Sequence, residues 1–224
     1  RVESKTLTSV DVDGNIYYHY IDEAASRMDR SKRLAADLDG CLSYTYSYSA
    51  VTPTRIIGKS GYSDAAWTTL KLTITQYDNA TNRIESKTLV AVDASGNIYY
   101  HYIDEVASRM DKSKRSVADL DGCLSHDYAY SGTTPTRIIQ KRGYTTAGWT
   151  TLKLTYAYYD NATNRMQSKT LASADVDGNI YYEFLDEDYA AQGYGRLSRS
   201  KRAVADSDSC LSFTYGYSGS TNRV

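Results

Sequence analysis

The chain has 224 residues and a formal net charge of −1, with 26 Lys and Arg residues interspersed among 27 Asp and Glu residues. This balance excludes a general electrostatic attraction to nucleic acid or to an acidic membrane surface. No apolar run approaches the roughly 20 residues that span a bilayer. The 23 Tyr residues, with only 2 Pro, indicate β-strands rather than a disordered linker.

The predicted elements alternate apolar and polar residues with the period of two that is typical of β-strands. Residues 16–20 and 44–48 place Tyr or Ile at every second position, and residues 70–77 carry their apolar side chains on one face. A polar stretch that we interpret as a hairpin loop follows each of these strands. The three loops are residues 22–26, 49–54 and 78–82.

An arginine ends each loop and precedes a second short strand, for example residues 84–89. The arginines in this phase are Arg1, Arg27, Arg55, Arg83, Arg109, Arg137, Arg165, Arg196 and Arg223. The first and last are 222 residues apart, so eight intervals give units of about 28 residues. Each second strand ends in Asp, Gly and Asn turn residues, as in residues 11–15, so one unit is predicted to be one hairpin. A helix over residues 22–36 is the alternative.

A longer repeat lies on top of the short one. Residues 1–82 align with residues 83–164 without a gap, and 60 of the 82 positions are identical. A third block, residues 165–224, follows the same pattern with five extra residues around residues 189–195. We interpret residues 1–224 as one continuous array of about eight short units. Because both ends fall at the same phase, we expect it to be an excerpt of a longer chain.

These patterns predict an all-β fold in which tandem hairpins form a spiral or solenoid-like sheet, the wall of a tube, rod or shell. Tyr suits a thin sheet because its ring is buried while its hydroxyl reaches water or a backbone partner. Arg can lie on a neighbouring ring or donate to an Asp or a loop carbonyl. We therefore expect each arginine to lock its loop to the adjacent hairpin; the alternative is a solvent-facing arginine after a turn.

The unit Tyr-x-Tyr-x-Asp, a short loop, then Arg and an aliphatic residue resembles the YD repeat of the Rhs (rearrangement hotspot) proteins, teneurins and shell-forming components of bacterial insecticidal toxin complexes. The matching signature residues are Tyr18, Tyr20, Asp22, Arg27, Tyr46, Tyr48, Arg55, Tyr77, Asp78, Arg83, Tyr100, Tyr102, Asp104, Arg109, Tyr128, Tyr130, Arg137, Tyr159, Asp160, Arg165, Arg196 and Arg223. The resemblance implies a spiral of hairpins that in relatives closes into a hollow shell around a toxin or cargo. The units here are longer and most lack the family's glycine before the arginine, so the spiral could open into a tube or rod.

Three kinds of residue could be mistaken for reactive chemistry. Cys41, Cys123 and Cys210 occur once per block, which favours small buried residues at a strand start over cross-linked pairs or a Cys-x-x-Cys metal site. Residues 11–15 and 175–179 have the oxygen density of a calcium loop but lack its distal Glu, which favours an Asx-type turn.

His19 and His101 share a phase, but Glu183 replaces them in the third block and His126 replaces Tyr44. No nucleophile or carboxylate recurs beside these histidines in the sequence. We therefore expect no enzyme activity and no catalytic, cofactor-binding or metal-binding residue.

Two further motifs remain open to interpretation. Asn79 and Asn161 begin Asn-Ala-Thr sequons in predicted loops, where they are glycosylation sites in a secreted glycoprotein or simple turn formers. Trp67 and Trp149 are in phase and could stack sugars, although aromatic residues on strands are more often packing residues.

The leading hypothesis is a structural repeat protein that forms the wall of a secreted or surface-exposed fibre or tube. Its partners would be other copies or adjacent repeats, with no nucleic acid and no membrane span in this segment. The alternatives are an Rhs-type shell segment enclosing a toxin or cargo, and an adhesin that binds surface glycans.

Overall fold

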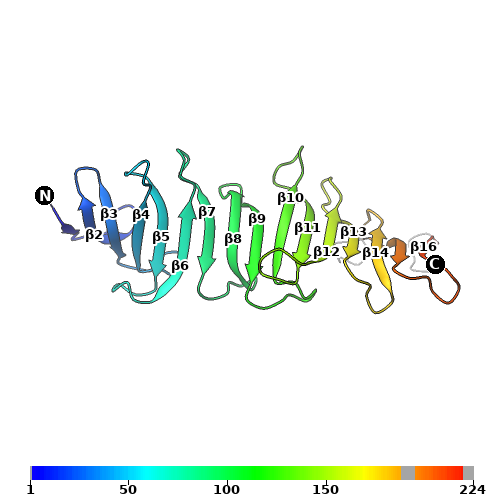
Figure 1. The fold of residues 1–224 in the computed structure, drawn as a ribbon. Helices are drawn as coiled ribbons and strands as arrows, with labels where there is room; N and C mark the ends of the chain where they lie inside the picture. The colour runs from blue at the N-terminus through cyan, green and yellow to red at the C-terminus, as the bar shows by residue number, and fades with distance from the viewer. Residues whose placement is uncertain (1, 188–194, 219–224) are drawn as a thin grey trace. The chain divides into compact units, whose positions relative to one another are not determined.

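The computed structural model describes residues 2–187 and 195–218. The regular secondary structure of these residues consists of β-strands alone (Figure 1). The all-β prediction is confirmed. The helical alternative is wrong, because residues 22–26 close a hairpin and Arg27–Arg33 form strand β3. The described residues contain no helix with the length and apolarity needed to cross a membrane.

The chain divides into two compact units, Arg1–Met110 and Asp111–Val224. In the first unit each strand pairs antiparallel with the next one in the sequence, so the predicted hairpins β2–β3, β4–β5 and β6–β7 form. The strands of this unit are β1 (Ser4–Thr6), β2 (Asn15–Asp22), β3 (Arg27–Arg33), β4 (Ser43–Tyr48), β5 (Ile56–Tyr62), β6 (Leu70–Gln76), β7 (Ile84–Leu89) and β8 (Asn97–Asp104).

The second unit repeats this order, starting from β9. The division between the two units falls within this strand. Its strands also pair antiparallel in sequence order, and β10–β11, β12–β13 and β14–β15 are hairpins. The strands are β9 (Arg109–Arg115), β10 (Ser125–Tyr130), β11 (Ile138–Tyr144), β12 (Leu152–Tyr158), β13 (Met166–Leu171), β14 (Asn179–Phe184), β15 (Leu197–Arg202) and β16 (Ser212–Thr214).

Several hairpin loops end in a left-handed residue directly before the arginine. These residues are Ser26, Asn82, Ser108 and Asn164, with φ of 53°, 52°, 53° and 49°. Glycine adopts this conformation most easily, and Asn and Ser here provide it at some steric cost. The position directly before these arginines is therefore left-handed although it carries a polar residue and not glycine.

The buried cores are small, as expected for a thin sheet. In the first unit Cys41, Tyr44, Leu72 and Ile74 form a buried cluster. Leu154 and Tyr156 take the places of Leu72 and Ile74 in the second unit and pack with Cys123. The one-sided burial predicted for residues 70–77 holds at Leu72 and Ile74, whereas Leu70 is exposed next to a register shift opposite Tyr62.

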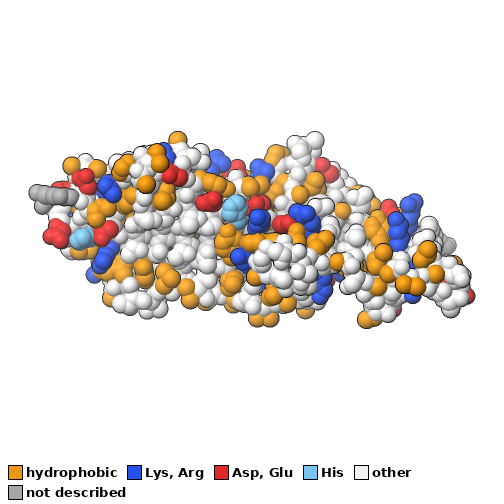
Figure 2. Space-filling view, in the orientation of Figure 1, with side chains coloured by type: hydrophobic (Ala, Val, Ile, Leu, Met, Phe, Trp, Pro, Cys, Tyr) orange, Lys and Arg blue, Asp and Glu red, His pale blue; other side chains and the backbone are white. Residues whose placement is uncertain are grey.

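Apolar side chains also project from the surface, where Figure 2 shows them mixed with charged groups. Four of them are fully exposed at the same place in the repeat, directly after the first Asp of a turn. They are Val12, Leu38, Leu120 and Val176.

Candidate functional site: contacts between neighbouring hairpins

An arginine from one hairpin contacts an aspartate from the next at the loop edge of the sheet. Arg55 Nη1 donates to Asp78 Oδ1 at 2.8 Å, and the buried Ser49 hydroxyl donates to Asp78 Oδ2 at 2.7 Å. The hydrogen bonds from Ser49 and Arg55 hold the pKa of Asp78 below its ordinary value. The second unit repeats these contacts with Arg137, Ser131 and Asp160 at 2.9 and 2.7 Å.

The next signature arginines make the same kind of ion pair. Arg83 Nη1 lies 3.0 Å from Asp104 Oδ1, and Arg165 Nη1 lies 3.5 Å from Asp186 Oδ1. Asp186 was missed by the sequence reasoning, although its alignment with Asp104 after Phe184 could have identified it. Each of these arginines thus reaches an Asp that follows it by 21 residues.

Two other arginines lie on the tyrosine ring of the following hairpin. The Arg27 guanidinium carbon is 5.1 Å from the Tyr48 ring centre, and that of Arg196 is 4.5 Å from the Tyr217 ring centre. Arg196 also makes a two-pronged contact with Glu187 in its own loop, at 2.6 and 2.9 Å. A cation over an aromatic face contributes roughly 0.5–2 kcal/mol, depending on desolvation.

Tyrosine hydroxyls at the same edge bind the backbone of a neighbouring hairpin. Tyr48 donates to the Met28 carbonyl at 2.7 Å and accepts from the Met28 amide at 3.0 Å. The same type of bond recurs from Tyr77 to the Tyr102 carbonyl at 2.6 Å. Tyr159 and Tyr217 donate likewise to the carbonyls of Phe184 and Leu197, both at 2.7 Å.

The remaining signature residues have more local positions. Tyr46 and Tyr128 share hydrogen bonds with the buried Ser31 and Ser113 of the adjacent strands, at 2.9 and 3.1 Å. The Tyr18 and Tyr20 rings lie 6.1 Å apart, as do those of Tyr100 and Tyr102.

Asp22 accepts from the Ala25 amide at 3.3 Å within its own loop. Arg109 begins β9 and Tyr130 ends β10, whereas Arg1 and Arg223 lie outside the described residues.

At the turns that join one hairpin to the next, an aspartate organises the backbone. Asp11 Oδ1 accepts from the amides of Asp13 and Asn15 at 3.0 and 2.8 Å, and its other oxygen accepts from the Tyr18 hydroxyl. Gly14 has φ of 79°, which explains the glycine. The same bonds recur around Asp93 and Asp175. This is the Asx-type turn that was favoured over a calcium loop.

In the other set of turns a cysteine lies two residues before the strand begins, and not at the strand start as predicted. The Cys41 amide donates to Asp37 Oδ1 at 3.0 Å, and the Tyr44 hydroxyl donates to the second Asp37 oxygen. Cys41 is fully buried, as is Cys123, whereas Cys210 is only partly buried; all three are free thiols. Gly61 leaves room for the sulfur, because a Cβ there would lie 2.6 Å from Cys41 Sγ.

Two histidines contact a carboxylate, but the two carboxylates stand at different positions of the repeat. His19 Nδ1 lies 2.5 Å from Asp29 Oδ1, and His126 Nε2 lies 3.0 Å from Asp119 Oδ2. His126 takes the role of Tyr44 in its turn. Burial, assisted by the charge of Lys141, lowers the pKa of His126 to about 4, so its ring is neutral at pH 7.

The tryptophans serve in packing. Trp67 has φ of 59°, and its indole nitrogen donates to the Tyr44 carbonyl at 3.0 Å. The Lys32 amino group lies 4.4 Å from its ring centre, and the Arg30 guanidinium 5.3 Å away. The protein's own cations therefore occupy this ring surface, which favours packing over sugar stacking. Trp149 makes the equivalent bond to the His126 carbonyl at 2.9 Å.

The two sequon asparagines differ in their surroundings. Each accepts from the Thr two residues later, as a turn former does. Asn79 is exposed, but Asn161 is half-buried and its side-chain nitrogen donates to Asp186 at 2.5 Å.

Comparison with known proteins finds no matching family model and no matching curated protein. Among solved structures, the chain is similar to the Photorhabdus luminescens Tc holotoxin pore with a mutated TccC3, with 11% identity and a TM-score of 0.30, covering 84% of this chain and 11% of that chain. It is also similar to the TcdB2-TccC3 crystal structure, with 11% identity and a TM-score of 0.29, covering 91% of this chain and 13% of that chain. The chain thus spans about a tenth of the length of either.

Proposed function

We propose that the chain is a structural repeat of the YD kind, forming part of the wall of a secreted or surface-exposed fibre or tube and acting without a reactive centre. The observation that carries this proposal is the recurrence of one set of contacts between successive hairpins. Within the first unit, Arg55 reaches Asp78, and Arg83 reaches Asp104.

These contacts favour a scaffold because an isolated two-stranded hairpin is marginally stable in water. Each hairpin gains hydrogen bonds, ion pairs and ring contacts only when the next one is in place. In such an array the stability is a sum over units and their interfaces, and identical interfaces propagate one geometry. The repeated Tyr, Asp and Arg side chains are thereby used for assembly within the chain.

The test is electron microscopy of tandem copies of residues 1–82, with two, four and eight copies joined in frame. Six strands per copy at a spacing of about 4.8 Å predict about 29 Å of added length for each copy. Rods whose length grows in proportion to copy number are expected. Round particles or strings of separate beads would refute the proposal that the chain forms the wall of a fibre or tube. Hollow ovoids would favour a shell that encloses cargo.

A further inference from the structure

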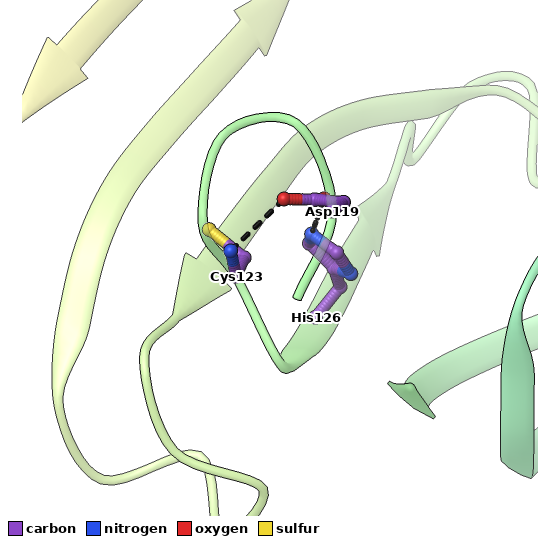
Figure 3. A group of neighbouring side chains, drawn as sticks. All are labelled: Asp119, Cys123 and His126. Carbon is purple, nitrogen blue, oxygen red and sulfur yellow. Dashed lines mark hydrogen bonds and ion pairs between the residues drawn. The ribbon is translucent and has the colours of Figure 1, made fainter. Parts of the chain in front are cut away.

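One turn of the second unit combines three different metal-ligand atoms. In the first unit the equivalent turn contains Asp37, Cys41 and Tyr44, which offer oxygen and sulfur only. In the second unit the residues are Asp119, Cys123 and His126, so an imidazole nitrogen joins them. One ligand atom from each lies within 4.8 Å of the other two. Figure 3 shows the Asp119 carboxylate joined to the His126 ring and to the backbone nitrogen of Cys123.

We propose that Asp119, Cys123 and His126 bind one divalent transition-metal ion, with Zn²⁺ as the best match. Zn²⁺ accepts carboxylate oxygen, thiolate sulfur and imidazole nitrogen in a tetrahedral arrangement, and three protein ligands leave a fourth position for water. This inference does not depend on the proposed scaffold function. It differs from the expectation from the sequence, which weighed Cys-x-x-Cys spacing and a calcium loop and assigned no metal-binding residue.

The distances in the turn are close to what such an ion needs. Two ligands at about 2.0–2.2 Å from a tetrahedral ion lie roughly 3.3–3.6 Å apart. The separation of His126 Nε2 and Asp119 Oδ2 is already 3.0 Å. The Cys123 sulfur needs to be roughly 3.6 Å from each of the other ligand atoms. Because the three ligand atoms lie within 4.8 Å of one another, each of these separations has to shrink by about 1.2 Å at most.

The turn also holds its ligands in place. Cys123 is fully buried and His126 is 3% exposed, and the Cys123 amide donates to Asp119 Oδ1 at 2.9 Å. This bond leaves Oδ2 directed at the imidazole. An open hollow of about 480 Å³ lies beside the turn, and Asp119 is the ligand residue that borders it, together with Arg115 and Asp121.

Binding an ion requires proton shifts at the imidazole and at the thiol. The proton of a neutral His126 ring has to lie on Nδ1 so that Nε2 can bind the ion. The Cys123 thiol has to release its proton to water, because the thiolate is the ligand. The two positive charges of the bound ion then balance the negative charges of one thiolate and one carboxylate, and one proton is released.

The charged groups around the site have mixed signs. Asp121 adds a negative charge near the sulfur, whereas nearby Lys and Arg side chains oppose the ion. These cations are Arg115, Lys141 and Lys153.

The experiment titrates the reduced full chain with Co²⁺ followed by absorbance, and with Zn²⁺ followed by calorimetry. One equivalent of Co²⁺ should give a thiolate-to-metal band and the intense visible bands of a tetrahedral site. His126→Tyr is the matched control, since it recreates the turn of the first unit with Tyr44 and should fold normally by circular dichroism. We expect it, and Cys123→Ser, to weaken binding by at least about 100-fold, more than the loss of a supporting residue.

A Cys41→Ser, Cys210→Ser variant should keep the full signal, because those thiols lie outside the site. The proposal is overturned if the folded wild-type chain gives no cobalt–thiolate band. It is equally overturned if the His126→Tyr variant binds as tightly as the wild type, or if removing Cys41 and Cys210 abolishes the signal.

Discussion

Replacing Tyr48 with Phe isolates one hairpin-to-hairpin contact without disturbing the ring. The hydroxyl donates to the Met28 carbonyl at 2.7 Å and accepts from the Met28 amide at 3.0 Å, and Arg27 lies over the ring itself. The variant keeps the cation–ring contact and loses both hydrogen bonds. Each such bond contributes about 1 kcal/mol net, so the free energy of unfolding of the first unit should fall by about 1–2 kcal/mol.

Urea unfolding followed by fluorescence measures this change. A Trp149→Phe background leaves Trp67 as the reporter of the first unit, and the urea midpoint should fall by roughly 0.5–1 M. Tyr17→Phe is the control, because the Tyr17 hydroxyl has no hydrogen bond to residues 2–187 or 195–218 while its ring also contacts a cation, Lys32. A Tyr48→Phe midpoint no lower than that of Tyr17→Phe would refute the reasoning.

Three other outcomes are expected. Replacing both Arg83 and Arg165 with Lys should lower the free energy of unfolding by up to about 1 kcal/mol in total, because the geometry of each ion pair is lost. The melting temperature should then fall by about 2–4 °C. An unchanged melting temperature would mean that these arginines are only solvated surface residues. Gly61→Ala should destabilise by about 1–3 kcal/mol, since its Cβ would lie 2.6 Å from Cys41 Sγ, and urea unfolding with Gly132→Ala as an exposed control measures the difference. The folded-state pKa of Asp78 is lowered, so its contribution is fully present above its unfolded pKa of about 4 and is lost as the pH falls through the folded value. The advantage of wild type over Asp78→Asn in the urea midpoint should therefore shrink between about pH 6 and about pH 3, and an advantage that stays constant with pH would contradict this.

Much of the site could be predicted from the sequence because hairpins are local structures. The period of two in residues 70–77 defined a strand with Leu72 and Ile74 on its buried face, and the Asp and Gly residues of residues 11–15 defined a turn. The spacing of arginines then defined the hairpin as the repeating unit. In each case the deciding residues are within a few positions of one another, so their pattern is visible before folding.

The partners across hairpins could not be predicted in this way. The sequence offered Asp22 and Asp78 as equivalent signature residues, yet Asp22 caps its own loop while Asp78 receives Arg55 from the hairpin before it. Which aspartate an arginine contacts depends on the pairing register of the strands and on the position of each loop. Both are set by contacts between residues more than 20 positions apart in the sequence.

The sequence alone therefore determined the strands, their loops, the repeat and its all-β class. Only the tertiary structure decided which charged group meets which, and that His126, at the position of Tyr44, faces the Asp119 carboxylate beside a buried thiol. The physical reason is that a strand's periodicity is written in consecutive residues, whereas a side-chain contact depends on how separate strands are brought together by folding.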